Sequence, residues 1–429
     1  MEQLKLERRA FLKKASLGFT GAAAVSLFTP VRSTLARSLS ELVIPSDDES
    51  SFAELAKEYM LGPDVTYFNH GSIGTIPKLI HRAHKGYLEL CESNPWLYMW
   101  SEPWEEARAQ TREKVARFLG CDSDELVFTH NTTEGFNLLA HGLPLSQEDE
   151  VLFSSLNYTG ASQCWFHYGQ TKGFSVKRFE FPIRETPALS HDDLVEIHAK
   201  QITEKTRVLV IPHIDNIVGI RHPVKALAQM AKAKGVEFIA VDAAQSVGMI
   251  PLNLDEMGID FYATSPHKWL QAPKGTGLMY IRKSSRASLT PMWVTWGQNR
   301  WRGTARIFED YGTRNLAEVL TLGDAVDFLE KLGLEEAQER RKALWTYFKR
   351  AVVSHPRMTW RSPKSWGLGS SLYAFEVADV NSREFFQEMY RKHGFVFRPF
   401  HSESWNTVRM SLNVFNTYTE IDRFIEIVA

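Results

Sequence analysis

The sequence predicts an α/β protein with a mostly parallel sheet between helices, followed by a smaller α+β domain at the C-terminus. Short apolar segments alternate with helical segments through the middle of the chain, which is typical of a parallel sheet covered on both faces. The 429 residues are also too many for one simple core and suit two domains of unequal size.

The apolar segments of the larger domain are taken as strands because they are short and end in polar or turn residues. The expected strands are 126–129, 151–154, 208–212, 238–241, 261–264 and 278–281. Helical patterns lie between them at 135–141, from Ala161 onward and at 224–234, where Gly235 provides a stop. We expect this domain to span residues 65–332, and the polar, acidic stretch 37–64 to be a linker and N-terminal segment.

The chain changes character near residue 333, and we expect a separate small domain from 333 to 429. A long charged helix at 335–353 is followed by a strand at 371–376, a helix at 382–393 and a strand at 408–412. Strands and helices mixed in this way predict an α+β domain.

Composition excludes few function classes. The formal net charge is −1, so no overall field favours nucleic acid or an anionic membrane. The three cysteines Cys91, Cys121 and Cys164 are widely spaced, which predicts neither a disulfide framework nor a metal site.

The N-terminus has the pattern of an export signal. Arg8 and Arg9 precede a short apolar run, 15–28, which resembles a twin-arginine signal read by a receptor. We expect residues 1–36 to be this signal, with a weak cleavage pattern at 33–36, and the protein to be exported to the periplasm by the twin-arginine machinery. A short amphipathic helix or an uncleaved anchor is the alternative.

Polar residues follow two neighbouring predicted strands. Asp242 ends one strand, and a buried carboxylate there needs a partner such as a protonated pyridine nitrogen. Gln245 is placed to bond a ring hydroxyl. Lys268 follows the next strand, where desolvation would turn it into an amine nucleophile.

A third feature suits a phosphate. Thr132 and Thr133 begin a helix after a strand, where backbone amides and the helix dipole favour an anion. Ser265 and His267 precede the lysine and supply further donors. Each feature alone has a simpler explanation: an ion pair, a surface loop or a helix cap. Together they predict pyridoxal phosphate (PLP) carried as a Schiff base on Lys268.

These motifs resemble class V aminotransferase-fold proteins of PLP fold type I, from about residue 65 to the C-terminus. The parallels are strongest at 242–248, 260–268 and 275–277. The resemblance implies a large domain with a sheet of the seven-stranded type. It also implies that Lys268 forms the Schiff base, Asp242 binds the pyridine nitrogen, Gln245 the ring oxygen, and Ser265 and His267 the phosphate.

The same resemblance assigns three more residues. Asn216 matches a cofactor-site asparagine, and Arg409 matches the residue that binds the substrate carboxylate, a task suited to its bidentate fork. Thr313 matches a segment that reaches the phosphate of a partner subunit, which implies a homodimer.

Two departures from the family pattern bear on the reaction. Many relatives stack a histidine on the cofactor ring, whereas this chain has Asn157 and Tyr158 there; Tyr158 has the better ring for stacking. Residues 394–408 contain no cysteine, where relatives that extract sulfur carry one. On that ground we expect the chain not to be a cysteine desulfurase, and the isopenicillin N epimerase-like branch is the nearest resemblance.

The expected reaction takes place at the α-carbon of an amino acid or similar small molecule, with Lys268 as general base. An epimerase-like or transaminase-like enzyme is the first interpretation, and a PLP-dependent C–S lyase is the second. A non-catalytic binding protein is disfavoured because Lys268, Asp242 and Gln245 are all retained. Several tryptophans are candidates for the pocket, although core or dimer packing explains them more simply: Trp96, Trp100, Trp104, Trp293, Trp296, Trp301 and Trp405.

Overall fold

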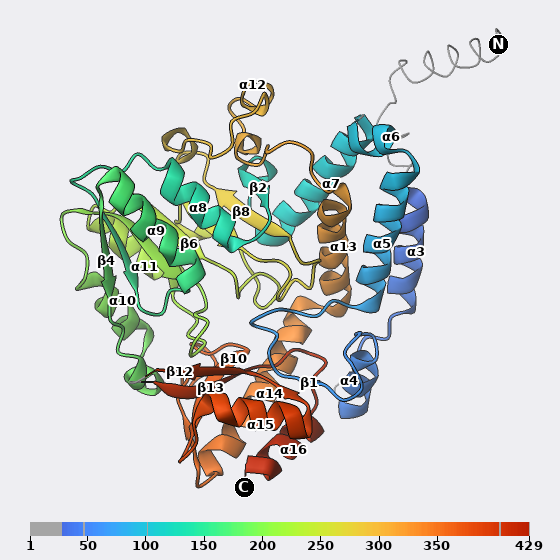
Figure 1. The fold of residues 1–429 in the computed structure, drawn as a ribbon, viewed down its shortest axis with the longest axis vertical. Helices are drawn as coiled ribbons and strands as arrows, with labels where there is room; N and C mark the ends of the chain where they lie inside the picture. Colours follow the sequence, from blue (N-terminus) through green and yellow to red (C-terminus); the bar gives the residue numbers. More distant parts are fainter. Residues whose placement is uncertain (1–27, 46–47, 101, 403–404, 429) are drawn as a thin grey trace, which may run out of the picture.

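The computed structural model describes residues 28–45, 48–100, 102–402 and 405–428. Figure 1 shows a large domain around a central sheet and a smaller domain that contains the C-terminus. The predicted twin-arginine pair, Arg8 and Arg9, lies outside the described residues.

The central sheet has seven strands in the order β2-β8-β7-β6-β5-β3-β4. Strand β8 is antiparallel to both of its neighbours, and the other pairs are parallel. The predicted fold class, a mostly parallel sheet with a smaller α+β domain, is confirmed. The strands are β2 (Leu126–Thr129), β3 (Glu150–Ser154), β4 (Ser175–Phe179), β5 (Thr206–Pro212), β6 (Phe238–Asp242), β7 (Phe261–Thr264) and β8 (Gly277–Ile281).

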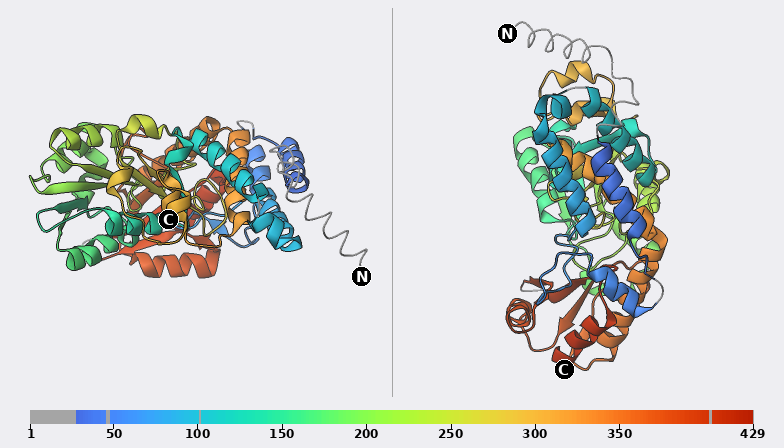
Figure 2. Two further views of the ribbon diagram at one scale, coloured as in Figure 1. Left: turned by 90° about the horizontal axis from the view of Figure 1, so that it is seen from above. Right: turned by 90° about the vertical axis from the view of Figure 1, so that its right-hand side faces the viewer.

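Both faces of this sheet are buried, because successive strand residues point to opposite sides. In β5, Val208 and Val210 join one apolar cluster with residues of α8 (Thr132–Gly142) and α9 (Thr159–Lys172). Leu209 and Ile211 join the other cluster. The helices on that second side are α5 (Lys78–Ser93), α7 (Glu102–Leu119), α10 (His191–Ala199), α11 (Val224–Ala233) and α13 (Leu316–Leu332). Figure 2 shows the layers from two further sides.

The small domain has a four-stranded antiparallel sheet covered by helices. Its strand order is β12 (Arg398–His401), β13 (Asn406–Ser411), β10 (Leu372–Val377) and β9 (Met358–Trp360), and its helices are α14 (Leu334–Ser354), α15 (Ser382–His393) and α16 (Tyr418–Val428). Strand β1 (Thr66–Tyr67) pairs with β11 (Phe395–Val396), so the segment that opens the predicted large domain lies against the small one. Because of this pairing, the residues that follow β1 lie between the two domains.

Two helices lie in the described part of the segment expected to be the end of a signal and a linker, α3 (Thr29–Glu41) and α4 (Glu49–Ala56). Helix α3 packs along α5 and α13 (Figure 1) because apolar residues recur on one of its faces. Phe28 is fully buried, with its ring against those of Tyr87 and Tyr98. Among the helices of the described residues, none combines the length and apolar character that crossing a membrane requires.

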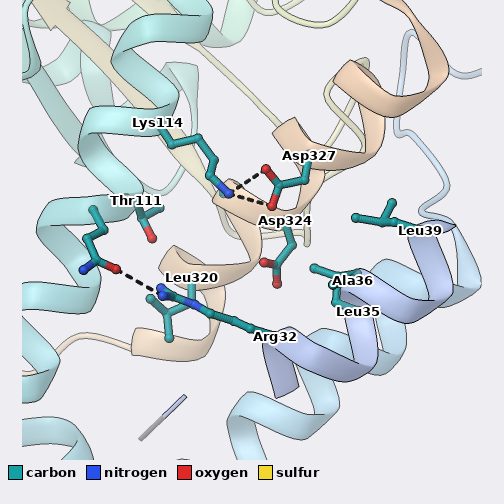
Figure 3. Close-up of a pocket in the computed structure, with 11 residues that line it drawn as sticks. Arg32, Leu35, Ala36, Leu39, Thr111, Lys114, Leu320, Asp324 and Asp327 are labelled. Carbon is teal, nitrogen blue, oxygen red and sulfur yellow. Dashed lines mark hydrogen bonds and ion pairs between the residues drawn. The ribbon is translucent and has the colours of Figure 1, made fainter. Parts of the chain in front are cut away.

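A polar cavity of about 270 Å³ lies under α3, between α7 and α13 (Figure 3). Arg32 donates a hydrogen bond to Gln110 at 3.1 Å, and Lys114 pairs with Asp327 at 2.6 Å. Burial raises the pKa of Asp324 to about 7, and the nearby Asp327 adds to the shift. None of the predicted site residues lines this cavity. Helix α3 is therefore a structural cover of the large domain.

Candidate cofactor and substrate site

Asp242 and Lys268 meet at the carboxyl ends of neighbouring strands, β6 and β7. Asp242 is 4% exposed, and its carboxylate accepts a hydrogen bond from the Ala244 amide at 3.0 Å. Burial raises the pKa of Asp242, while Lys268 acts in the opposite direction. No basic group of the described residues lies within ion-pair distance of this carboxylate, so it is a buried acid that lacks a paired cation.

Lys268 lies in the turn after β7, where its amide donates to the Ser265 carbonyl at 3.1 Å. Burial lowers the pKa of the Lys268 amine to about 8; Asp242 opposes that shift and Arg409 adds to it. The charges of both Asp242 and Arg409 therefore act on this amine. A lysine in this state is a nucleophile and a proton acceptor near neutral pH.

Two of the predicted phosphate ligands, Thr132 and Ser265, come together at the start of α8. The Thr132 amide donates to the Ser265 hydroxyl at 3.0 Å, and the two hydroxyl oxygens are 2.8 Å apart. The Nδ1 atom of His267 is buried and has no hydrogen-bond partner among the described residues. Burial, with help from Lys268 and Lys274, lowers the pKa of His267 to about 4, which keeps its ring neutral. Thr133 follows at the helix start with its side chain exposed.

Both the nitrogen and the oxygen of the Gln245 side-chain amide are hydrogen-bonded. Its Nε2 atom donates to the Gly71 carbonyl at 2.8 Å, and its Oε1 atom accepts from the indole of Trp269 at 2.8 Å. An amide nitrogen carries two protons, so one N–H remains for a further acceptor such as a ring oxygen.

Arg409, in β13, is 2% exposed and is bound only to neutral groups. It donates to the Asn216 carbonyl at 2.8 Å, to Asn69 Oδ1 at 2.8 Å and to Ser72 Oγ at 2.7 Å, while its Nε has no partner among the described residues. Burial lowers the pKa of Arg409 to about 9, and Arg398 adds to this. A buried cation without a carboxylate partner is suited to bind an anion.

The loop after β1 was not among the predicted site segments. Besides Asn69 and Ser72, this loop supplies His70, whose Nε2 lies 3.0 Å from the Lys268 carbonyl oxygen. A Cβ on Gly74 would lie 2.4 Å from that same oxygen, so only glycine fits there. The sequence pattern that could have indicated this loop is a small polar run, 69–72, directly after a short apolar strand.

Of the two candidates for ring stacking, Asn157 is already used by the local turn. It is 8% exposed, and its Oδ1 accepts from the amide and hydroxyl of Ser154 at 3.2 and 3.1 Å. Tyr158 is 49% exposed and lines a pocket together with Asn216. The stacking role of Tyr158 stays a prediction, as does the cofactor contact of Asn216.

Thr313 is not brought to Lys268 within this chain. It is exposed in a loop and lines a separate pocket that also contains Trp100 and Trp296. These two tryptophans are 60% and 66% exposed, so packing in the core does not explain them. The predicted role of Thr313 toward a partner subunit is untested.

The residues around Lys268 fit PLP. The unpaired Asp242 suits a protonated ring nitrogen, and the orphaned Nδ1 of His267 with the start of α8 suits a phosphate. Lys268 would supply the amine, and Arg409, whose Nε has no partner among the described residues, would bind an anion. The arrangement can hold an amino acid by its carboxylate while a lysine moves a proton at its α-carbon.

Comparison with known proteins also indicates a PLP-dependent enzyme. The family described as aminotransferase class-V matches residues 67–424. Isopenicillin N epimerase of Streptomyces clavuligerus is 27% identical over 399 residues, which covers 88% of this chain and 97% of that protein. The apo cysteine desulfurase from Thermococcus onnurineus NA1 matches with a TM-score of 0.75 at 22% identity, over 90% of this chain and 97% of that one. The cystine C–S lyase C-DES matches with the same score at 20% identity, over 85% and 97%.

These findings correct one expectation. The exclusion of cysteine desulfurases, drawn from the missing cysteine in 394–408, is wrong. A probable cysteine desulfurase of Pyrococcus abyssi is 24% identical over 395 residues, covering 87% of this chain and 95% of that protein, and the Thermococcus onnurineus enzyme shares the fold. One loop was too narrow a basis, because the residues that hold the cofactor and the carboxylate are needed whichever bond breaks afterwards.

The family match spans both domains and contains Asp242, Lys268 and Arg409, which the fold brings to one place. Chemistry at the α-carbon of an amino-acid-like substrate is what this arrangement supports. The chain belongs to the aminotransferase class V family, and its cofactor is pyridoxal phosphate.

Proposed function

We propose that this protein is an epimerase-like or transaminase-like enzyme that removes and returns the α-proton of an amino-acid-like substrate. The observation that carries the proposal is the position of Lys268 after β7, beside the strand β6 that ends at Asp242, where burial lowers the pKa of its amine to about 8. With that pKa about a tenth of the amines are uncharged at pH 7, compared with fewer than about one in a thousand for an ordinary lysine. Lys268 is therefore suited to act as the general base.

The neighbouring residues divide the remaining tasks. Arg409 holds the substrate carboxylate through its free donor capacity, and Asp242 keeps the ring nitrogen of the cofactor protonated. Pyridoxal phosphate, when bound, supplies an electron sink for the charge left at the α-carbon. Burial of both charged side chains keeps water from screening them, which strengthens their effect on the reacting atoms.

C–S bond cleavage is the second candidate function. It is favoured by the similarity to proteins named cysteine desulfurase and cystine C–S lyase. Removal of an α-proton by Lys268 also opens a route to that outcome, so the two candidates share the same machinery and differ in what leaves the substrate.

Incubation of the PLP-bound protein with an amino-acid panel in deuterated water tests the proposal. We expect deuterium at the α-carbon, with inversion for an epimerase or a keto acid for a transaminase. Released sulfide, persulfide or thiol from cysteine or cystine would instead establish C–S cleavage. Absence of α-deuterium and of any product across the panel would refute catalysis at the α-carbon.

We also propose that the protein is exported as a folded, cofactor-loaded enzyme through its twin-arginine segment. Cofactor binding stabilises the folded state by mass action, which favours loading before export. Because Phe28 and Leu35 are buried against the large domain, we place any processing before Phe28 rather than at 33–36. Changing Arg8 and Arg9 to lysine should retain yellow, active protein in the cytoplasm; normal export of that variant would refute the signal.

Assembly as a homodimer is the third part of the proposal. The exposed Thr313 and the exposed indoles of Trp100 and Trp296 support it, since a partner subunit would bury them. Sedimentation should give twice the chain mass, and Thr313→Ala should weaken phosphate retention without changing α-carbon chemistry at saturating cofactor. A monomer with full cofactor affinity would contradict this assignment.

A further inference from the structure

A second group of basic side chains lies beside Arg409 and is not explained by one substrate carboxylate. A pocket of about 490 Å³ runs from Tyr158 and Asn216 to Arg178 and Arg398. Its lining contains two arginines, three amide side chains and several hydroxyls, and it contains no acidic residue. The pocket therefore offers an anion many donors and no repelling charge.

Arg398 and Arg409 form a like-charged pair across two antiparallel strands. They are directly opposite in the register of β12 and β13, and the charge of Arg398 adds to the effect of burial in lowering the pKa of Arg409. Like charges in this position destabilise a sheet unless something compensates them. Both guanidinium groups also lie 5.7 Å from the ring of Phe400, which forms a wall shared with the pocket.

Compensation by the protein itself is incomplete. Arg398 is exposed on β12, a strand that faces the large domain (Figure 1). Among the described residues, no carboxylate lies within ion-pair distance of Arg398. Arg178 pairs with the exposed Glu180 at 2.7 Å. The buried Asp215 is bound to backbone amides of its own turn, at 2.8 Å from those of Ile217 and Val218. Asp215 keeps its charge and acts on Arg409, and Glu180 pairs with Arg178, so the positive charge without a carboxylate partner in the pocket lining is that of Arg398.

We propose that this pocket is a subsite for a second anionic group, and that the substrate is an amino acid whose side chain ends in a carboxylate. This inference rests on the proposed function, because it assumes that Arg409 takes the α-carboxylate. Arg398 then binds the far carboxylate, and Gln163 and Asn216 line the same pocket. A neutral side chain would leave Arg398 without a carboxylate partner and would bind more weakly.

Calorimetry of the PLP-bound protein with matched acids tests the subsite without requiring turnover. Dicarboxylates from succinate to pimelate are compared with monocarboxylates of equal length. Since Arg398 is exposed, we expect the best dicarboxylate to bind roughly 3- to 10-fold more tightly than its monocarboxylate partner. Arg398→Gln should abolish that difference. Arg117→Gln, which removes the same charge from an exposed position on α7, should retain it.

Substrate preference gives the second readout. Deuterium exchange at the α-carbon should favour glutamate or α-aminoadipate over glutamine or norleucine, and Arg398→Glu should shift the preference toward ornithine or lysine. Equal binding of mono- and dicarboxylates by the unaltered protein, or an equal loss of both in Arg398→Gln, would overturn the subsite. If dicarboxylates bind as expected but no amino acid exchanges its α-proton, the subsite stands and the proposed function fails.

Discussion

Arg409 provides the sharpest test of how substrate is held. It is buried, donates three hydrogen bonds to neutral groups and has no carboxylate partner among the described residues. A substrate carboxylate would gain charge-assisted hydrogen bonds worth about 1.5–3 kcal/mol from this guanidinium. Arg409→Gln should therefore raise the apparent dissociation constant of an amino acid by roughly 10- to 150-fold.

The assay pairs this variant with a change in the substrate. Deuterium exchange is measured for an amino acid and for the amine that lacks its carboxylate, in the unaltered protein, in Arg409→Gln and in the exposed-site control Arg117→Gln. The unaltered protein and the control should discriminate against the amine by the factor above, and Arg409→Gln should not discriminate. If the variant slows both compounds equally and still prefers the amino acid, Arg409 does not bind the carboxylate.

Three further predictions concern Asp242, Gly74 and Asp324. Asp242→Asn should slow α-proton exchange far more than it weakens substrate binding, because its charge matters most when negative charge develops at the α-carbon; an unchanged exchange rate would show a structural role. Gly74→Ala should reduce cofactor retention, because its Cβ would lie 2.4 Å from the Lys268 carbonyl oxygen. Gly367→Ala should not reduce it, because its Cβ meets nothing closer than 3.9 Å. Equal retention of the cofactor by both variants would contradict the packing argument. The pKa of Asp324 is raised to about 7 by burial, so the folded state binds the extra proton and unfolding should become easier as pH rises from about 4 to 7, by up to about 4 kcal/mol. Asp324→Asn should flatten that pH dependence in chemical denaturation, and an unaltered slope would refute the assignment.

Much of the fold followed from local sequence patterns, because the central strands are short, apolar and buried on both faces. Strands β2 and β7 lie where the sequence predicted them, and α15 matches its predicted range. Strand β4 was missed because its residues include Ser175, Lys177 and Arg178, as expected for an edge strand with one solvated side. A polar edge strand has no apolar run by which to recognise it.

The site was predictable where one segment carried the signal and was missed where distant segments meet. Asp242, Lys268 and the start of α8 each follow a strand, so their position at one sheet edge could be inferred. The contacts of Asn69 and Ser72 with Arg409 join residues more than 300 positions apart, and a short loop gives no sign of such a pairing. Helix α3 (Thr29–Glu41) was not predicted, because its residues were assigned to the end of the signal and to the linker.

The most direct test of the central claim is to locate the cofactor on the chain. The yellow protein is reduced with borohydride, digested and sequenced by mass spectrometry, with Lys268→Ala treated in parallel. The account predicts a pyridoxyl group on the peptide that contains Lys268 and none in the variant. A label on another lysine, such as the nearby Lys274, or a variant that still traps the cofactor, would contradict it.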